Sequence, residues 1–519
     1  MSEHKPFWNS PEEFKDLSKY PYIAIDLETR DPDLKKTGSG SVVGNGEIIG
    51  VAVAVDGWSG YYSFGHTSDN YFSKEAVLKW LKDICALPCP KIFHNAMYDV
   101  CWIRAYNIEI KGIIVDTMIM AALLNENRVW YSLNSLALLE LNEVKEEKAL
   151  QAAAADAGVD AKSEMYKLPA SMVGEYAEKD AELTLKLFKK FSGQIKQQGL
   201  EKIFNLEVKL FRCLVKMRFT GVRVDIDKAH QLKHVLETRE KSLLLEVKKA
   251  TGVDVQIWAA RSIAKVFDNL GLSYKRTEKT NAPSFTKDIL SSHENEVVKR
   301  IAEARDLNKA HTTFIDTIIK HEHKDRIHAD INQLRSDAGG TITGRFSYSN
   351  PNLQQIPSRN DLLGPAIRGL FLPEEGCKWG CFDYSQQEPR LVVHYASADD
   401  IISEDDAVKH MVTSFKTDPQ MDFHQIVADM ASIKRKQAKI INLGLFYGMG
   451  KAKLQQSLNL ETRDEAEKLF EKYHNNVPFV KALMNATSRD ASRDGEIQTI
   501  VVGYVDLING KEMFMNQEF

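Results

Sequence analysis

The chain has 519 residues, of which 27% are charged and 43% apolar, and its 68 lysines and arginines stand against 72 aspartates and glutamates. This composition excludes a disordered, a collagen-like and a membrane-embedded protein, and the length predicts two to four domains. The chain has no net positive charge that would bind nucleic acid unspecifically, so any contact with DNA would have to come from local patches.

Strand and helix patterns alternate over the first part of the chain. Tyr22–Leu27 and Glu47–Val55 are short apolar runs, which predict adjacent strands of a mixed sheet. Helical patterns with an apolar side follow at Lys74–Ile84, Met118–Leu124 and Val173–Phe191. Strands followed by helices predict an α/β unit that ends near Gln197.

Long amphipathic helices are predicted from Ile203 to Glu322. Four apolar residues near the start of this stretch are spaced like one core-facing stripe, namely Leu206, Leu210, Leu214 and Met217. A helical region therefore separates two mixed ones, and the predicted fold class combines α/β with α+β.

Two carboxylates lie at the end of the first predicted strand, in the string YIAIDLET. Asp26 and Glu28 are two positions apart, so both side chains leave the same face of the strand. Two carboxylates held together repel each other unless a divalent cation lies between them, which makes a metal site a candidate. In isolation, however, such a pair at a strand end is more often solvated surface.

Two further pairs could bring more acidic groups to this strand end. Asn95 and Asp99 lie four apart in HNAMYD, and Tyr176 and Asp180 lie four apart in YAEKD, which on helices places each pair on one face. The order DxE, NxxxD, YxxxD resembles the three motifs of the proofreading 3′–5′ exonuclease superfamily, whose fold is similar to that of ribonuclease H.

That resemblance implies roles for the exonuclease residues. Asp26, Glu28 and Asp180 would hold one ion, and Asp99 would help to place a second. Mg²⁺ is the ion that all-oxygen ligands favour, with Mn²⁺ as the alternative. Tyr176 would orient the attacking water, and the competing interpretation of this residue is a core tyrosine on a helix face.

A long polar loop, DAGGTITGRFSYSNPNLQQIPSR, runs from Asp337 to Arg359. It resembles the TGR...PNLQ.IP motif of family A DNA polymerases, which contacts the primer–template. This resemblance implies DNA contacts by Arg345, Asn352 and Gln354.

The string FDYSQQEPR resembles motif A of the same polymerases. The resemblance implies that Asp383 is catalytic and binds both metal ions of the polymerase site, and that Tyr384 adds its backbone carbonyl. Glu388 would block the 2′-hydroxyl of a ribonucleotide, and Arg390 would contact DNA. Pro389 departs from the family pattern and fits poorly within a central strand.

The string KRKQAKIINLGLFYGMG places Arg435, Lys439, Leu443 and Tyr447 at steps of four on one helix face, cationic at its start and apolar at its end. Such a face suits an incoming nucleoside triphosphate, since the cations meet the phosphates. The string resembles motif B of the family, although Leu443 stands where Phe or Tyr is usual. Between these motifs, His424 is either a phosphate-facing residue or a satisfied core histidine.

The likeness to the family runs from about Tyr22 to Thr499 and then ends. The His-Asp-Glu tripeptide that supplies a second polymerase aspartate in the family does not occur in the sequence. We therefore expect a polymerase half truncated before this motif C and completed by a second polypeptide that carries it. The site would hold two metal ions once completed.

The expected architecture is a ribonuclease H-like exonuclease domain followed by a partial right-hand polymerase. The exonuclease domain would cover residues 1–200 and the polymerase 201–519, with the thumb at about 205–330, the palm at about 331–400 and 481–519, and the fingers at about 401–480.

Two functions compete. The first is a template-dependent DNA polymerase of phage type with 3′–5′ proofreading, which binds primer–template DNA and dNTPs in the cytoplasm of a bacterial or phage-infected cell. The alternative is a stand-alone metal-dependent 3′–5′ exonuclease whose polymerase remnant only grips DNA. A membrane partner is not expected, because the apolar runs are too short to span a bilayer.

Overall fold

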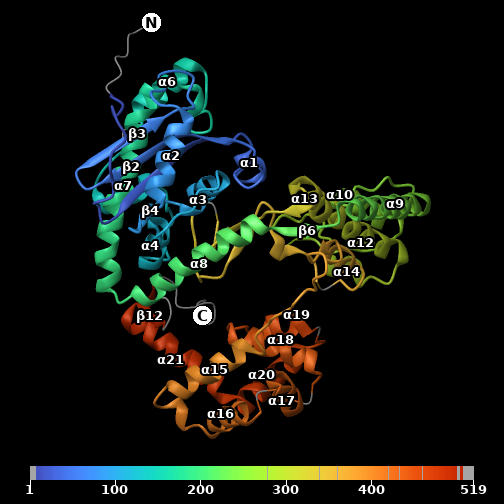
Figure 1. Ribbon diagram of the computed structural model, residues 1–519. Helices are drawn as coiled ribbons and strands as arrows, with labels where there is room; N and C mark the ends of the chain where they lie inside the picture. The colour runs from blue at the N-terminus through green and yellow to red at the C-terminus, as the bar shows by residue number, and fades with distance from the viewer. Residues whose placement is uncertain are drawn as a thin grey trace.

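Figure 1 shows the computed structural model, in which three packed parts follow one another along the chain. The structure describes residues 8–499 and 503–506, apart from positions 146, 278, 338, 359, 419, 432 and 459. None of the described helices combines the length and the apolar character that crossing a membrane would require.

The first part is built on a five-stranded sheet with the strand order β3-β2-β1-β4-β5. β1 (Ile23–Arg30) lies at its centre, antiparallel to β2 (Glu47–Val55) and parallel to β4 (Lys91–Phe93). β3 (Trp58–Ser63) and β5 (Ile114–Asp116) form the two edges. The predicted mixed sheet and the adjacency of its first two strands are therefore confirmed.

Helices pack on both faces of this sheet (Figure 1). The longest, α7 (Ala170–Gln197), packs on the face that carries Ala24, Ala52 and Ala54, whose small side chains let the helix come close. The predicted helices are confirmed, and the helical elements of this part are α1 (Leu34–Thr37), α2 (Lys74–Cys85), α3 (Ala96–Ala105), α4 (Thr117–Leu124), α5 (Leu133–Leu136), a π-helical turn (Ala137–Leu141), α6 (Lys148–Ala157), a 3-10 turn (Met165–Lys167) and α7.

Helix α8 (Glu201–Thr220) leads from the first part to the second (Figure 1). The predicted apolar stripe on this helix is wrong, because Leu206 and Met217 are 50% and 49% exposed. The buried side is a different one, with Ile203, Glu207, Phe211, Leu214, Val215 and Arg218. The helix packs against both α3 and β9. Its buried charged side chains have polar partners in or beside these elements. Burial along α8 therefore does not follow hydrophobicity.

The second part is mainly helical and encloses its own core. Its helices are α9 (Ile226–Thr251), α10 (Ala260–Asn269), α11 (Lys287–Ser291), α12 (Glu296–Lys309), α13 (Asp316–His321) and α14 (Leu363–Arg368), with a π-helical turn (Ala310–Ile315) and a 3-10 turn (Leu353–Gln355). A small sheet has the order β11-β6-β8-β7 and a hairpin pairs β9 with β10; the strands are β6 (Val222–Val224), β7 (Glu322–His323), β8 (Arg326–Ile327), β9 (Asp330–Asn332), β10 (Ser347–Ser349) and β11 (Phe371–Leu372).

The third part is a helical body with a separate apolar core. It contains α15 (Gln387–Ala398), a 3-10 turn (Ile402–Glu404), α16 (Asp406–Thr417), α17 (Phe423–Ala431), α18 (Arg435–Phe446), α19 (Lys451–Leu458), α20 (Arg463–Asn476) and α21 (Pro478–Asp494), followed by the antiparallel strands β12 (Glu496–Thr499) and β13 (Gly503–Asp506). Pro389 lies in the first turn of α15, where a missing backbone N–H costs nothing, so the segment after Glu388 is helical and not a strand.

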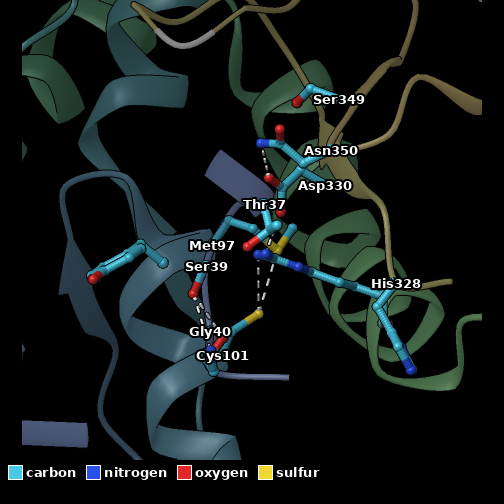
Figure 2. Close-up of polar contacts among 12 residues, drawn as sticks. Thr37, Ser39, Gly40, Met97, Cys101, His328, Asp330, Ser349 and Asn350 are labelled. Carbon is cyan, nitrogen blue, oxygen red and sulfur yellow. Dashed lines mark hydrogen bonds and ion pairs between the residues drawn. The ribbon is translucent and has the colours of Figure 1, made fainter. Parts of the chain in front are cut away.

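A buried polar contact joins the first part to the second. Arg218 of α8 forms an ion pair with Asp330 of β9, and its Nη1 lies 3.8 Å from Cys101 Sγ of α3. Asn350 Nδ2 donates a hydrogen bond to Asp330 at 2.8 Å. Figure 2 shows Asp330 and Asn350 on one side of this junction and Met97 and Cys101 of α3 on the other.

Candidate metal centre and nucleic-acid interface

Strand β1 carries the first two candidate ligands, Asp26 and Glu28, on the sheet face that α7 covers. The register of β1 against β2 is regular up to Glu28 and shifts between Glu28 and Thr29. Such a bulge bends the strand and often re-aims a side chain beside a functional site. The predicted common face of the two acids is confirmed, since their carboxylates come together with a third.

Helix α7 supplies that third carboxylate. Ligand oxygens of Asp26, Glu28 and Asp180 all lie within 4.8 Å of one another. Asp180 is buried, and Tyr176 lies one turn before it on the same helix. The structure thus brings together residues that are more than a hundred positions apart in the sequence, as the motif order led us to expect.

Asp99 lies beside this group and does not belong to it. It is buried in the first turn of α3, and its Oδ1 accepts a hydrogen bond from the backbone N–H of Leu27 at 3.0 Å. Asn95 does not share a helix face with it, because Asn95 precedes the helix in a left-handed conformation. Asp99 is therefore held beside the strand that carries the two ligands, close enough for the charge of Asp26 to affect it.

Burial and mutual repulsion raise the pKa of every carboxyl group at this place. Burial, and after it the charge of Asp180, raises the pKa of Asp26 to about 7. Burial and the two other acids raise the pKa of Glu28 well above its ordinary value. Burial, and after it the charge of Asp26, raises the pKa of Asp99. Burial also raises the pKa of Asp180. The negative charges of these carboxylates are thus incompletely neutralised by nearby positive charge.

Sequence reasoning missed one member of this site, Lys145. Its side chain is 2% exposed, its Nζ forms an ion pair with Asp180, and that nitrogen lies 3.0 Å from the centre of the Tyr176 ring. Lys145 lies between the π-helical turn and α6, in the charged string KEEK, a pattern that favours a solvated surface. The only sequence signal was its place between the second and third motifs.

The residues of the cluster fit a divalent cation. Three carboxylates within reach of one ion provide the all-oxygen ligand set that hard cations prefer. A positive charge, the Lys145 ammonium, already lies beside Asp180.

In the polymerase half, Asn352 and Gln354 shape their own loop. Asn352 accepts a hydrogen bond from the backbone N–H of Gln354 at 3.1 Å, and Gln354 Nε2 donates to the carbonyl of Phe346 at 2.9 Å. Arg345 is more than half exposed, with Nη2 at 3.7 Å from Glu388 Oε1. Arg359 lies outside the described residues.

The motif A residues occupy an irregular segment and the start of α15. Asp383 and Tyr384 are exposed, and Asp383 belongs to no group of three metal-ligating side chains among the described residues. Glu388 accepts a hydrogen bond from Tyr447 Oη at 2.9 Å, which joins motif A to the predicted nucleotide-binding face. The guanidinium of Arg390 lies over the ring of Phe415 at 4.5 Å.

Helix α18 carries the other predicted nucleotide-binding residues. Arg435 forms an ion pair with Asp422 at 2.5 Å, Lys439 is exposed and Leu443 packs partly against the core of the third part. His424 is buried and lies 2.8 Å from Asn442 Nδ2 of the same helix, so the interpretation as a satisfied core histidine fits the structure.

A cavity of about 640 Å³ connects the two halves of the molecule. Leu206 and Leu210 of α8 line one side of it, and Arg345 and Tyr384 line another. Two of the residues predicted to face a core therefore line a cavity together with residues of the predicted polymerase half.

Comparisons with known proteins agree with this division of the chain. Residues 226–517 match the family model described as DNA polymerase family A, and residues 10–196 match the one described as 3′-5′ exonuclease. A DNA-directed DNA polymerase of Pseudomonas phage M6 is 33% identical, with 97% of this chain and 82% of that protein covered.

Two more distant proteins show how far the likeness extends. DNA polymerase I of Pseudomonas aeruginosa is 27% identical over 94% of this chain and 52% of its own length. The solved POL domain of Pol1 from M. smegmatis, in complex with DNA primer-template and dNTP, has a TM-score of 0.73 and 20% identity, with 94% of this chain and 79% of that chain covered. The fold of this chain is accordingly that of such a polymerase domain.

Proposed function

Because this chain belongs to family A of the DNA polymerases and carries the 3′-5′ exonuclease domain, we propose that it extends primers on a DNA template and removes mispaired 3′ ends. One observation supports the proofreading activity: ligand oxygens of Asp26, Glu28 and Asp180 lie within 4.8 Å of one another. The proposed domain boundaries are those expected above, with the exonuclease domain ending near the end of α7.

The exonuclease centre would use its own residues in distinct ways. Asp26, Glu28 and Asp180 hold a Mg²⁺ or Mn²⁺ ion, and Asp99 helps to place a second. When bound, the two ions acidify the attacking water and offset the negative charge of the scissile phosphate. Tyr176, whose hydroxyl lowers the pKa of Asp180, directs that water toward the phosphate.

The polymerase centre would take primer–template DNA and dNTPs, the ligands of the M. smegmatis protein. Arg435 and Lys439 of α18 meet the triphosphate, and Leu443 and Tyr447 pack against sugar and base. Glu388, held by the Tyr447 hydroxyl, limits the space for a 2′-hydroxyl. Arg345, Asn352, Gln354 and Arg390 belong to the segments that grip DNA, and Asp383 and Tyr384 bind the metal ions of this centre.

The second candidate function is degradation without synthesis. It is favoured by the contrast between the two sites: three carboxylates meet in the exonuclease domain, whereas Asp383 lies exposed on an irregular segment. The proposal that a second polypeptide supplies a further aspartate to Asp383 belongs to the first function.

Primer extension separates these candidates. The assay uses the full chain carrying Asp26→Ala and Glu28→Ala, so that shortening does not hide synthesis, with Mg²⁺, dNTPs and a 5′-labelled primer–template. We expect extension only when a polypeptide that carries the His-Asp-Glu motif is added, and we expect Asp383→Asn to reduce that extension at least about a hundredfold, as for loss of a group that stabilises transition-state charge. Absence of extension in the presence of that polypeptide, with shortening by the unaltered chain, would leave the second candidate.

A further inference from the structure

Lys145 places a positive charge inside the carboxylate cluster. Burying a lysine ammonium, which is strongly hydrated, is costly unless opposite charges surround it. Here the side chain is 2% exposed and its Nζ is paired with Asp180, while its charge also lowers the pKa of Asp26 and Glu28. The ammonium therefore offsets the mutual repulsion of the three carboxylates.

The side chains of Glu143 and Glu147, two positions before and after Lys145, form hydrogen bonds of their own. Glu143 accepts hydrogen bonds at 2.8 Å from two lysines of α7, and Glu147 accepts one from Asn134 Nδ2 at 2.5 Å. The four-carbon stem of a lysine turns about several single bonds. The ammonium can therefore leave the cluster by rotation of its own side chain.

Glu147 offers the ammonium a second partner. Against the effect of burial, the pKa of Glu147 is lowered by the hydrogen bond from Asn134 and by the charges of Lys162 and Lys145, so the two side chains already influence each other. A divalent ion beside Asp180 would repel the ammonium twice as strongly as a monovalent one. Repulsion by the divalent ion would therefore favour movement of the Lys145 side chain, and the Glu147 carboxylate would accept its ammonium group.

We propose that Lys145 is the resident counter-cation of the metal-free exonuclease centre and moves from Asp180 to Glu147 when a divalent ion binds. This inference rests on the proposed exonuclease function. Lys145 acts as a positioning residue, because it keeps Asp26, Glu28 and Asp180 gathered before the ion arrives. The positive charge of Lys145 also repels the divalent ion. Lys145 therefore keeps the ligands in place and at the same time weakens ion binding.

Equilibrium binding of Mn²⁺ to the full chain without DNA tests this competition. The variants are Lys145→Met, which keeps the apolar stem, and Lys189→Met as the matched control, since Lys189 pairs with Asp56 away from the cluster. We expect Lys145→Met to bind Mn²⁺ about tenfold more tightly, within the usual range for two coupled sites. Lys189→Met should bind as the unaltered chain does. Unchanged or weaker binding by Lys145→Met would overturn the proposal.

Thermal unfolding gives a readout that does not depend on activity. In EDTA, Lys145→Met should melt below the unaltered chain, since the acids lose their counter-charge, and saturating Mn²⁺ should raise its Tm by more than it raises that of the unaltered chain. Lys145→Arg keeps a cation and should restore the Tm in EDTA. If Lys145→Met in EDTA melts no lower than the unaltered chain, Lys145 does not hold the cluster together and the proposal fails.

Asp26→Ala distinguishes failure of this inference from failure of the proposed function. Loss of Mn²⁺ binding in Asp26→Ala, together with unchanged binding in Lys145→Met, would remove only the role of Lys145. Mn²⁺ binding by Asp26→Ala that equals that of the unaltered chain would instead remove the metal centre itself.

Discussion

Asp26 has a pKa of about 7, against an ordinary value of 3.8, because burial and the charge of Asp180 both favour its protonated form. Glu28 and Asp99 are shifted in the same direction, and burial is the largest cause for each. Folding of the metal-free chain therefore takes up protons, and binding of a divalent ion has to release them. At the residue scale, ion binding and pH are thus linked.

The first prediction concerns this linkage. Between pH 4 and pH 7 the unfolded chain has lost the Asp26 proton while the folded chain retains it, so this group stabilises the fold at low pH and its contribution disappears as the pH rises toward 7. The Tm increase caused by Mg²⁺ should grow over the same interval, because the ion binds the deprotonated carboxylates. Scanning fluorimetry with and without Mg²⁺ at constant ionic strength measures both effects.

Asp26→Asn is the control for this prediction, since it removes the titrating group and keeps the size of the side chain. Its Mg²⁺-dependent Tm increase should be small at every pH. A Tm increase in the unaltered chain that stays constant from pH 5 to pH 8 would contradict the assignment of these carboxyls as metal ligands.

At the scale of elements, regular periodicity made much of the fold predictable. The strands β1 and β2 and the helices α2 and α4 lie where their apolar patterns placed them, within about three residues at each end, and α7 extends beyond its predicted stretch at both ends. The common face of Asp26 and Glu28 followed from the two-residue repeat of a strand. Sequence patterns succeed here because the apolar side chains of these elements are buried in the cores on the two faces of one sheet.

The buried face of helix α8 and the position of Lys145 could not be predicted from sequence patterns. The face of α8 that packs between two parts of the molecule buries Glu207 and Arg218, which no hydrophobic pattern could indicate. Lys145 lies in a charged string, and only the fold brings it to Asp180. In both cases a buried charge is stabilised by a partner distant in the sequence, so the local sequence carries no sign of it.

Helix α7 supports the second prediction, which compares two of its glycines. A Cβ at Gly174 would lie 2.1 Å from the ring of Trp8, whereas a Cβ at Gly193 would meet no atom within 4 Å. Gly174→Ala should therefore destabilise the chain by about 1–3 kcal/mol through overpacking. Gly193→Ala should stabilise it by about 0.5–1 kcal/mol, because alanine is the better helix former.

Urea unfolding of both glycine variants and the unaltered chain measures these differences in the free energy of unfolding. Since both positions lie in α7, a change of opposite sign at the two sites isolates the contact with Trp8. Equal effects of the two substitutions would show that this ring does not limit the approach of the helix.

At the scale of the whole molecule, the exonuclease and polymerase parts share a buried junction. Arg218 is 4% exposed and joins Asp330 on one side and Cys101 on the other. The junction lies between the sheet that carries the carboxylate cluster and the hairpin that leads into the loop with Arg345. It therefore joins the two parts of the chain through a buried ion pair.

The third prediction follows from removing the charge of Arg218. Arg218→Met leaves Asp330 without its cation and should destabilise the chain by about 3 kcal/mol, the low end for a broken buried pair because Asp330 is partly exposed. Adding Asp330→Asn should recover part of this loss, since no unpaired charge remains. Denaturant unfolding of the single and double variants checks it, and a double variant less stable than Arg218→Met would contradict the charge argument.

We propose that carboxylates from distant parts of the chain hold the ions with which DNA is cut at a 3′ end. Its most direct test follows a 5′-labelled oligonucleotide with the full chain and Mg²⁺ in the absence of dNTPs. We expect stepwise shortening from the 3′ end, reduced at least about a hundredfold by Asp26→Ala and by Glu28→Ala. Shortening that persists at the original rate in both variants would contradict it.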